Sequence, residues 1–289
     1  TSVCNLVFYS ITLSSLRMII DTANRWFVIV NPVAGKGLGL TDWPVISKLL
    51  RDNSIAFDFA FTEHRFHAIE LSVEAVNNGY RRLIVVGGDG TLSEVINGIM
   101  RAELTPEQRS QIKFGLMPRG TGNDFARHWG LTKDFKRSLD VFFAGKTKPL
   151  DIGCVTYWRN NIEHHRYFVN SLGFGFDPLV CRMANQLKYY IGSHHVNYFF
   201  ALFGGLAKYK SQHMRLDVKG ETVLEDKLFV AAVSNGSYVG GGMRLNPEAD
   251  PSDGQLHAIF LTPPSLKQIS QAVVKLFNGK LHELPFVHA

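Results

Sequence analysis

The chain has 289 residues, of which 45% are hydrophobic and 19% are charged, and this balance excludes an intrinsically disordered protein. The formal net charge of +6 suits an anionic partner such as a nucleotide, an acidic membrane surface or a nucleic acid, but it is mild for this length. Three cysteines, far apart in the sequence, predict neither a disulfide framework nor a zinc site, so a reducing cytoplasm is expected.

Residues 1–20 differ from the rest of the chain. The first sixteen carry no charge, and their apolar run is too short to span a bilayer. They also lack the basic start and the small-residue cleavage site of a signal peptide. We expect them to be an N-terminal extension, with the natural domain beginning near Met18.

The next segment alternates between strand and helix patterns. The expected elements are a strand at 25–30, a helix around 43–50, a strand at 56–61, a helix at 68–76 and a strand at 82–86. A strand at 113–117 and a helix ending at Gly145 complete this half. A βαβαβ order predicts a parallel sheet with helices on both faces, whose ligands lie beyond the carboxyl ends of the strands.

The run at residues 85–94 joins a buried strand to a helix through a glycine-rich turn. Glycines allow a phosphate close to the backbone, and the N–H groups at a helix start point toward it. Asp89 is informative here, because a carboxylate beside phosphates is repulsive unless a divalent cation or a reacting hydroxyl lies between them. The alternative is a plain βα turn in which Asp89 caps the helix.

Two more polar loops follow strands of the same predicted sheet. Residues 31–37 carry Lys36, which could reach a phosphate, although an ordinary surface loop is an equal reading. Residues 120–127 open a short helix, and there the alternative is an Asn-Asp helix cap. The polar candidates of this loop are Thr121, Asn123 and Asp124. Glycine loops that converge on one sheet edge predict a phosphate site, with Asp124 as a second acid.

The composition changes near Lys148 toward β-rich sequence. Strands are expected at 150–156, 166–172, 227–234 and 255–261, with an apolar helix at 197–209. Glycine turns begin at Ser171 and Asn235. Asp250 and Asp253, beside Gly254, could ligate Mg²⁺, and an Asp-Gly hairpin turn carries equal weight.

The sequence does not support a histidine metal site, a serine-nucleophile site or an RNA-binding surface. The eleven histidines show no metal-ligand spacing, and no G-x-S-x-G motif precedes a helix. The sequence also lacks the aromatic and basic sheet signature of RNA-binding domains, so we expect no nucleic-acid partner.

With these motifs in view, the chain resembles the diacylglycerol kinase catalytic-domain family, in its bacterial lipid-kinase branch, which is related to the sphingosine kinases. The resemblance runs from about Arg25 to Ala289 and rests on residues 31–37, 87–94, 120–127 and 253–254. It implies an α/β N-terminal domain like that of the phosphofructokinases, a parallel sheet flanked by helices over residues 21–148. It further implies a C-terminal β-sandwich over residues 149–289, with ATP in the cleft between the domains.

The resemblance also implies a set of site residues. Those that would bind the nucleotide are Asn31, Pro32, Val33, Ala34, Gly35, Thr62, Gly87, Gly88, Asp89, Gly90, Thr91, Leu92, Ser93, Glu94 and Thr121. Asp250, Asp253 and Gln255 match the family's Mg²⁺ site, the last through its carbonyl oxygen. The implied cofactors are ATP and Mg²⁺.

The family's general base is a glutamate in an Asp-Gly-Glu strand that follows the segment resembling residues 277–289, and the sequence ends at Ala289 before it. We therefore expect the C-terminal domain to be truncated at its end. The catalytic candidates within these residues are Asp89 and Asp124, with Asp89 as the base because the resemblance to sphingosine kinases assigns that role to the acid of the matching loop.

The expected function is an ATP-dependent lipid kinase that transfers the γ-phosphate to a hydroxyl of diacylglycerol or a related lipid alcohol. It would act in the cytoplasm as a peripheral protein at the inner face of the membrane. A NAD kinase, which shares the Gly-Gly-Asp-Gly-Thr turn, and an inactive nucleotide-binding homologue remain alternatives. The identity of the lipid and the formation of a homodimer stay open.

Overall fold

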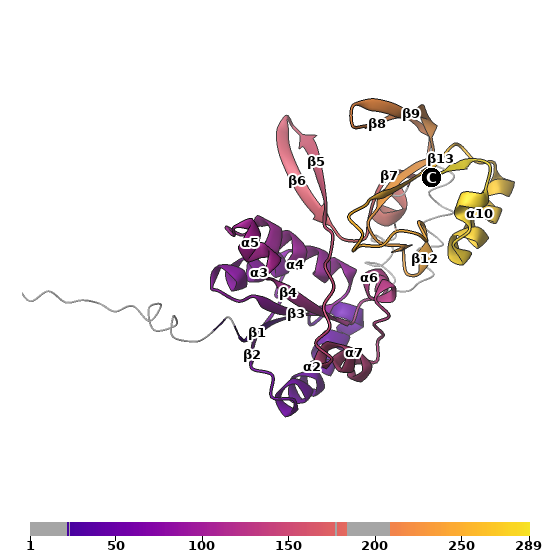
Figure 1. Cartoon of the computed structure of the whole chain (residues 1–289). Coiled ribbons are helices and arrows are strands. Elements are labelled where there is room, and N and C mark those ends of the chain that lie inside the picture. Colours follow the sequence, from indigo (N-terminus) through magenta and orange to yellow (C-terminus); the bar gives the residue numbers. More distant parts are fainter. Residues whose placement is uncertain (1–21, 23, 177, 184–208) are drawn as a thin grey trace, which may run out of the picture.

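The N-terminal half of the chain forms an α/β domain around a four-stranded parallel sheet, in the computed structural model shown in Figure 1. The structure describes residue 22 and residues 24–176, 178–183 and 209–289. The sheet has the order β2-β1-β3-β4. Its elements are β1 (Trp26–Val30), α2 (Ala34–Asp52), β2 (Phe57–Phe61), α3 (His67–Asn77), β3 (Arg82–Gly87), α4 (Asp89–Arg101), α5 (Pro106–Ser110), β4 (Lys113–Pro118), α6 (Asp124–His128) and α7 (Phe135–Phe143).

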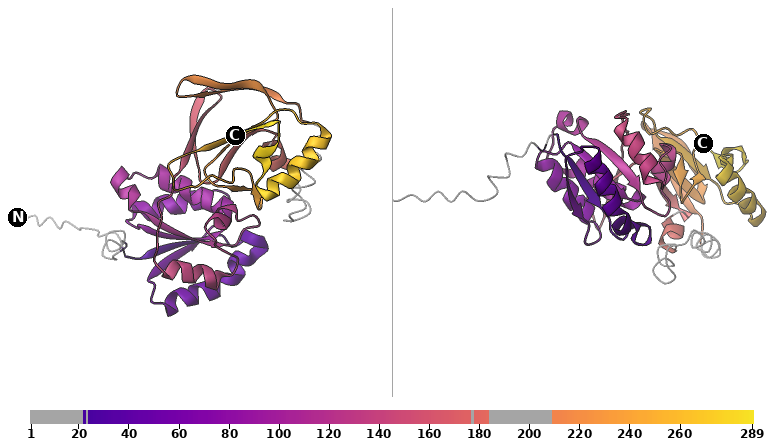
Figure 2. Two further views of the ribbon diagram at one scale, coloured as in Figure 1. Left: turned by 45° about the vertical axis from the view of Figure 1, so that its right-hand side comes forward. Right: turned by 90° about the horizontal axis from the view of Figure 1, so that it is seen from below.

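Helices cover both faces of this sheet, as Figure 2 shows. On one face, α3 and α4 bury residues such as Leu71 and Ile96 against β1 and β3. On the other face, α2 and α7 bury Trp43 and Leu139. Because both faces are covered, β3 reads as a continuous apolar run rather than an alternating one. The βαβαβ order expected from the sequence is confirmed.

The C-terminal half is an antiparallel β domain, as expected. Its main sheet has the order β14-β13-β10-β7, and α10 packs on it through Ala272 and Leu276. The hairpins β5–β6 and β8–β9 are separate two-stranded sheets (Figure 1). The elements are β5 (Gly153–Arg159), β6 (Ile162–Phe168), β7 (Ser171–Gly175), β8 (Gln212–Val218), β9 (Glu221–Leu228), β10 (Val230–Ser234), β11 (Tyr238–Val239), β12 (Met243–Arg244), β13 (His257–Leu261), α10 (Leu266–Asn278), η2 (Leu281–Glu283) and β14 (Val287–His288).

Several element boundaries differ from the sequence-based expectation. The strand expected at 166–172 is two strands, because the carbonyl oxygen of Asn170 turns aside to accept hydrogen bonds from the N–H groups of Asn235 and Gly236. The glycine turn expected at Ser171 is strand β7, which pairs with β10. Residues 35–37, near the start of α2, all have a positive φ and are therefore not helical. Helices α5 and α10 and the β8–β9 hairpin were not expected.

Two expectations concern residues outside the described part of the chain: the N-terminal extension and nearly all of the apolar helix at 197–209. In the described ranges, no helix combines the length and the apolar character that crossing a membrane requires.

Candidate functional site

Three loops meet at the carboxyl edge of the parallel sheet. We call residues 31–37, 87–91 and 120–124 the first, second and third loops; they follow β1, β3 and β4. The side-chain amide of Asn31 donates to Thr91 Oγ1 at 2.9 Å, which ties the first loop to the second. A Cβ placed on Gly88 would lie 2.6 Å from Gly120 Cα, so the second and third loops touch through their backbones. Only glycine permits this approach.

The second loop delivers the N-terminus of helix α4 to this edge. Gly88 is the N-cap in an extended conformation and, as a glycine, offers no side chain to cap the helix. A Cβ placed on Gly90 would meet no described atom within 4 Å. The first turn of α4 thus lacks an N-cap side chain and has open space beside Gly90, features that suit phosphate binding at a helix start.

Asp89 is the first residue of α4 rather than its N-cap, and its carboxylate has partners outside this helix. Its Oδ1 accepts a hydrogen bond from the Phe125 N–H at 3.0 Å and a longer one, at 3.4 Å, from the Asn170 side-chain amide. Asp89 thus links the second loop to helix α6 and to the C-terminal domain.

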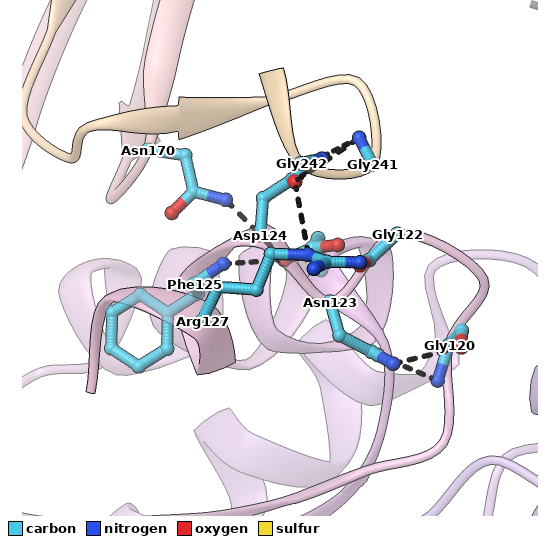
Figure 3. Close-up of polar contacts among 10 residues, drawn as sticks. Gly120, Gly122, Asn123, Asp124, Phe125, Arg127, Asn170, Gly241 and Gly242 are labelled. Carbon is cyan, nitrogen blue, oxygen red and sulfur yellow. Dashed lines mark hydrogen bonds and ion pairs between the residues drawn. The ribbon is translucent and has the colours of Figure 1, made fainter. Parts of the chain in front are cut away.

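Asp124 lies at the boundary between the two domains and is 7% exposed (Figure 3). Its carboxylate accepts hydrogen bonds from two C-terminal glycines. The Gly241 N–H donates to both carboxylate oxygens, at 2.8 and 3.1 Å, and the Gly242 N–H donates to Oδ1 at 2.7 Å. Arg127, one turn along α6, has its Nε 4.0 Å from Asp124 Oδ1.

The electrostatics of this pair of acids favour a proton at Asp124. Burial, and next the negative charge of Asp89, raise the pKa of Asp124 to about 6, against the opposing effect of the glycine N–H groups and Arg127. A Cβ on Gly122 would lie 3.2 Å from Asp89 Oδ2 and 3.3 Å from Asp124 Oδ2, so glycine leaves the space between the two carboxylates open. Two carboxylates that share such a space suit a divalent cation or a shared proton.

Other residues expected at the nucleotide site lie nearby. Thr62 follows β2 and donates its N–H to the Val30 carbonyl, so it sits at the same sheet edge. Thr121 is half-buried in the third loop. Asn123 was a polar candidate of the third loop, but its side-chain amide is engaged with both the N–H and the C=O of Gly120, so it shapes the loop.

The three expected metal ligands share one loop of the C-terminal domain. Asp250 Oδ1 accepts hydrogen bonds from the backbone and hydroxyl of Ser252, which lower its pKa. Asp253 Oδ1 accepts from the Gln255 N–H at 2.8 Å. This loop reaches α6, where His128 Nε2 lies 3.8 Å from Asp250 Oδ1. Burial lowers the pKa of His128.

Sequence reasoning missed three residues that connect these parts: Asp151, His128 and Asn170. Asp151 Oδ2 accepts from the Gly254 N–H at 2.6 Å, which fixes the loop with the expected metal ligands. His128 Nδ1 lies 3.2 Å from Ser237 Oγ. The motif around Asp124 extends to His128, but no local signal marks Asp151 or Asn170, whose partners are distant in the sequence.

The expectation that no histidines have metal-ligand spacing was wrong for one group. Among the described residues, one group of three places a possible ligand atom from each member within 4.8 Å of the others: His64, His67 and Glu70. The two imidazole rings are stacked at 13°, so one ion cannot lie in both ring planes. His67 Nδ1 also accepts the Glu63 N–H. This group reads as a surface cluster.

Comparison with known proteins agrees with this architecture. The family model "Diacylglycerol kinase catalytic domain" matches residues 25–155, and "YegS C-terminal NAD kinase beta sandwich-like domain" matches residues 170–289. A diacylglycerol kinase of Mycobacterium tuberculosis (strain H37Rv) is 31% identical over 218 residues, which are 75% of this chain and 66% of that protein. One of Staphylococcus haemolyticus is 29% identical over 256 residues, 88% of this chain and 72% of that protein. A probable lipid kinase, YegS-like, of Cronobacter sakazakii is 31% identical over 222 residues, 76% of this chain and 69% of that protein.

A crystal structure of a diacylglycerol kinase from Bacillus anthracis has the same fold. It superposes with a TM-score of 0.64 at 22% identity, covering 86% of this chain and 80% of that one. The first family model covers the half of the chain that forms the parallel sheet, and the second covers the half that forms the main antiparallel sheet. The chain therefore belongs to the diacylglycerol kinase catalytic-domain family, in its bacterial lipid-kinase branch.

Proposed function

We propose that this protein is an ATP- and Mg²⁺-dependent lipid kinase, which transfers the γ-phosphate of ATP to the hydroxyl of diacylglycerol or a related lipid alcohol. The observation that carries the proposal is the convergence of the three loops on the uncapped start of α4, beside the carboxylates of Asp89 and Asp124. We further propose residues 21–148 as the nucleotide domain and 149–289 as the second domain, each matched largely by its own family model.

The first-turn N–H groups of α4 would hold the phosphates, with Gly90 and Thr91 as the nearest backbone donors. The side-chain hydrogen bond between Asn31 and Thr91 would keep the first loop closed over the same site. We assign the nucleotide contacts to residues 31–35 of the first loop, to Thr62, to residues 87–94 and to Thr121. Most of the catalysis would then come from positioning and charge neutralisation, as in other phosphoryl transfers.

The donor set near the site fits Mg²⁺, which prefers carboxylate and carbonyl oxygens and leaves part of its shell to phosphates and water. Asp250 and Asp253, with the Gln255 carbonyl, would supply such oxygens from one loop, which Asp151 fixes by its bond to Gly254. When bound, the ion would neutralise charge on the transferred phosphoryl group.

Asp89 would accept the proton of the lipid hydroxyl as its oxygen bonds to the γ-phosphorus and ADP leaves. Its carboxylate is oriented by the Phe125 N–H, so it would reach the reacting hydroxyl in a fixed direction. Relatives named diacylglycerol kinase support a lipid acceptor. The protein would reach this acceptor as a peripheral protein, since no helix among its described residues could span a membrane.

Transfer of ³²P from [γ-³²P]ATP tests the proposal, with the natively expressed protein, a panel of mixed-micelle lipids and NAD as competing acceptors. The panel holds diacylglycerol, phosphatidylglycerol, a sphingoid base and a polyprenyl alcohol. Label in one lipid is the expected result. Label in NAD alone would replace the proposal with a NAD kinase, and tight ATP binding with no labelled acceptor would favour an inactive nucleotide-binding homologue.

A further inference from the structure

Three glycines in succession form a tight loop between β11 and β12. Gly240, Gly241 and Gly242 have φ angles of +61°, +92° and +116°, a backbone path that side chains rarely allow. We call these three residues the glycine loop. Successive N–H groups in such a path can point the same way and form a concave anion site. An anion receptor built from backbone is thus present in the C-terminal domain.

The occupant of this receptor belongs to the other domain. Three hydrogen bonds of 2.7 to 3.1 Å run from Gly241 and Gly242 to the carboxylate of Asp124, across 117 and 118 residues of sequence (Figure 3). Hydrogen bonds to an ionised carboxylate are about twice as strong as neutral ones. Because Asp124 is buried, these bonds fix the direction in which its oxygens point.

We propose that the glycine loop is a positioning element, which holds the Asp124 carboxylate in its working orientation and thereby makes the candidate active site complete only when the two domains are docked. The catalytic part of this inference rests on the proposed kinase function. Asp89 is bonded to the Asn170 amide from the same C-terminal domain, so both acids depend on the docked arrangement.

The charges that face Asp124 explain why a positioning element is needed. Asp89, on α4, repels it across the space at Gly122, and Arg127, on α6, attracts it at 4.0 Å. The glycine loop contributes no ionisable side chain and acts through its N–H groups alone. Those N–H groups favour the ionised form of Asp124 and oppose its rotation away from Asp89.

The test compares two glycines with matched backbone strain. Gly241→Ala places a side chain at φ +92°, where the N–H contacts Asp124, whereas Gly220→Ala does so at φ +88° in the β8–β9 turn, with no described atom within 4 Å of the new Cβ. The two φ angles differ by only a few degrees, so Gly220→Ala controls for the cost of placing a side chain at such a φ.

We expect Gly241→Ala to lower kcat by ~10- to 100-fold, the scale of a misplaced catalytic group, with a KM for ATP that changes by less than about threefold. Gly220→Ala should retain kcat within about twofold. In an Asp124→Ala background the effect of Gly241→Ala should shrink to less than about threefold, because the carboxylate that the loop holds is no longer there. Equal effects of the two glycine variants, or full additivity with Asp124→Ala, would overturn the proposal.

Amide hydrogen exchange gives a readout that needs no enzymatic activity. The N–H groups of Gly241 and Gly242 should be protected in the native protein and exchange at least ~10-fold faster in Asp124→Ala. If exchange is unchanged, the glycine loop does not hold Asp124. If exchange responds while no acceptor is phosphorylated, the contact is real and the proposed kinase function is what fails.

Discussion

The buried carboxyl of Asp124 makes the stability of the protein depend on pH in a specific way. Its pKa rises from 3.8 to about 6 on folding, so the folded protein holds this proton more tightly than the unfolded chain. A raised pKa contributes stability that is fully present below the unfolded pKa and is lost as pH rises through the folded pKa. With 1.36 kcal/mol for each pKa unit, the whole contribution is about 3 kcal/mol, of which about 2 kcal/mol is lost between pH 4 and pH 7.

Asp124→Asn removes this titration and keeps Oδ1, which accepts from both Gly241 and Gly242. The free energy of unfolding of the native protein, measured by urea denaturation relative to the variant, should therefore fall by about 2 kcal/mol between pH 4 and pH 7. The difference should be nearly flat above pH 7, because the Asp124 carboxyl is then ionised in both the folded and the unfolded state.

A difference that stays constant over this range, or that grows in favour of the native protein as pH rises, would refute the reasoning. The former would mean that Asp124 titrates normally, and the latter that its ionised form is the one stabilised by folding. A ¹³C NMR titration of the Asp124 carboxyl gives an independent midpoint, expected near pH 6.

Four further variants separate structural roles from ligand binding at and beside the loops. Gly88→Ala should lower the free energy of unfolding, measured by urea denaturation, by at least about 1 kcal/mol, because its Cβ would clash with the backbone of the third loop. Gly90→Ala should have the stability of the native protein. It should bind ATP at least about tenfold more weakly in calorimetric titration, because its Cβ would occupy the space proposed for the phosphates. Normal ATP affinity of Gly90→Ala would contradict that site. Thr91→Val removes the bond to the first loop and should cost about 1 kcal/mol of unfolding free energy, and no cost would mean that this bond is not maintained in solution. Asp42→Asn leaves the buried Arg119 guanidinium without its 2.8 Å ion-pair partner and should cost about 2 kcal/mol in the same assay, so an unchanged midpoint would discount that pair.

The sequence predicted the parts of this fold that local pattern controls. The apolar run of β3 and the helical spacing that follows Gly88 are both local, and the loops between strands and helices mark the sheet edge. Right-handed crossovers limit the possible strand orders, but the order β2-β1-β3-β4 itself came from the structure. Helix α10 was missed although Ser265 and Gln268 form a capping box that the sequence displays.

The contacts between the domains could not be predicted in the same way. Asp124 accepts a hydrogen bond from Gly241, which lies 117 residues away in the sequence, and neither motif indicates that the other is its partner. Asn170 lies inside an apolar stretch whose pattern predicts one continuous strand, so the sequence does not indicate that its side-chain amide bonds to Asp89. The candidate phosphate site was therefore visible from the sequence, whereas the anchoring of its acids by the C-terminal domain needed the structure.

The measurement that tests the central claim most directly is the rate of ³²P transfer from ATP to the preferred lipid by Asp89→Ala, compared with the native protein at saturating ATP. Because Asp89 would take the proton from the attacking hydroxyl, the account predicts a loss of at least ~100-fold in rate, with ATP still bound. Near-normal turnover by this variant would contradict the assignment of Asp89 and, with it, the mechanism built on the second loop.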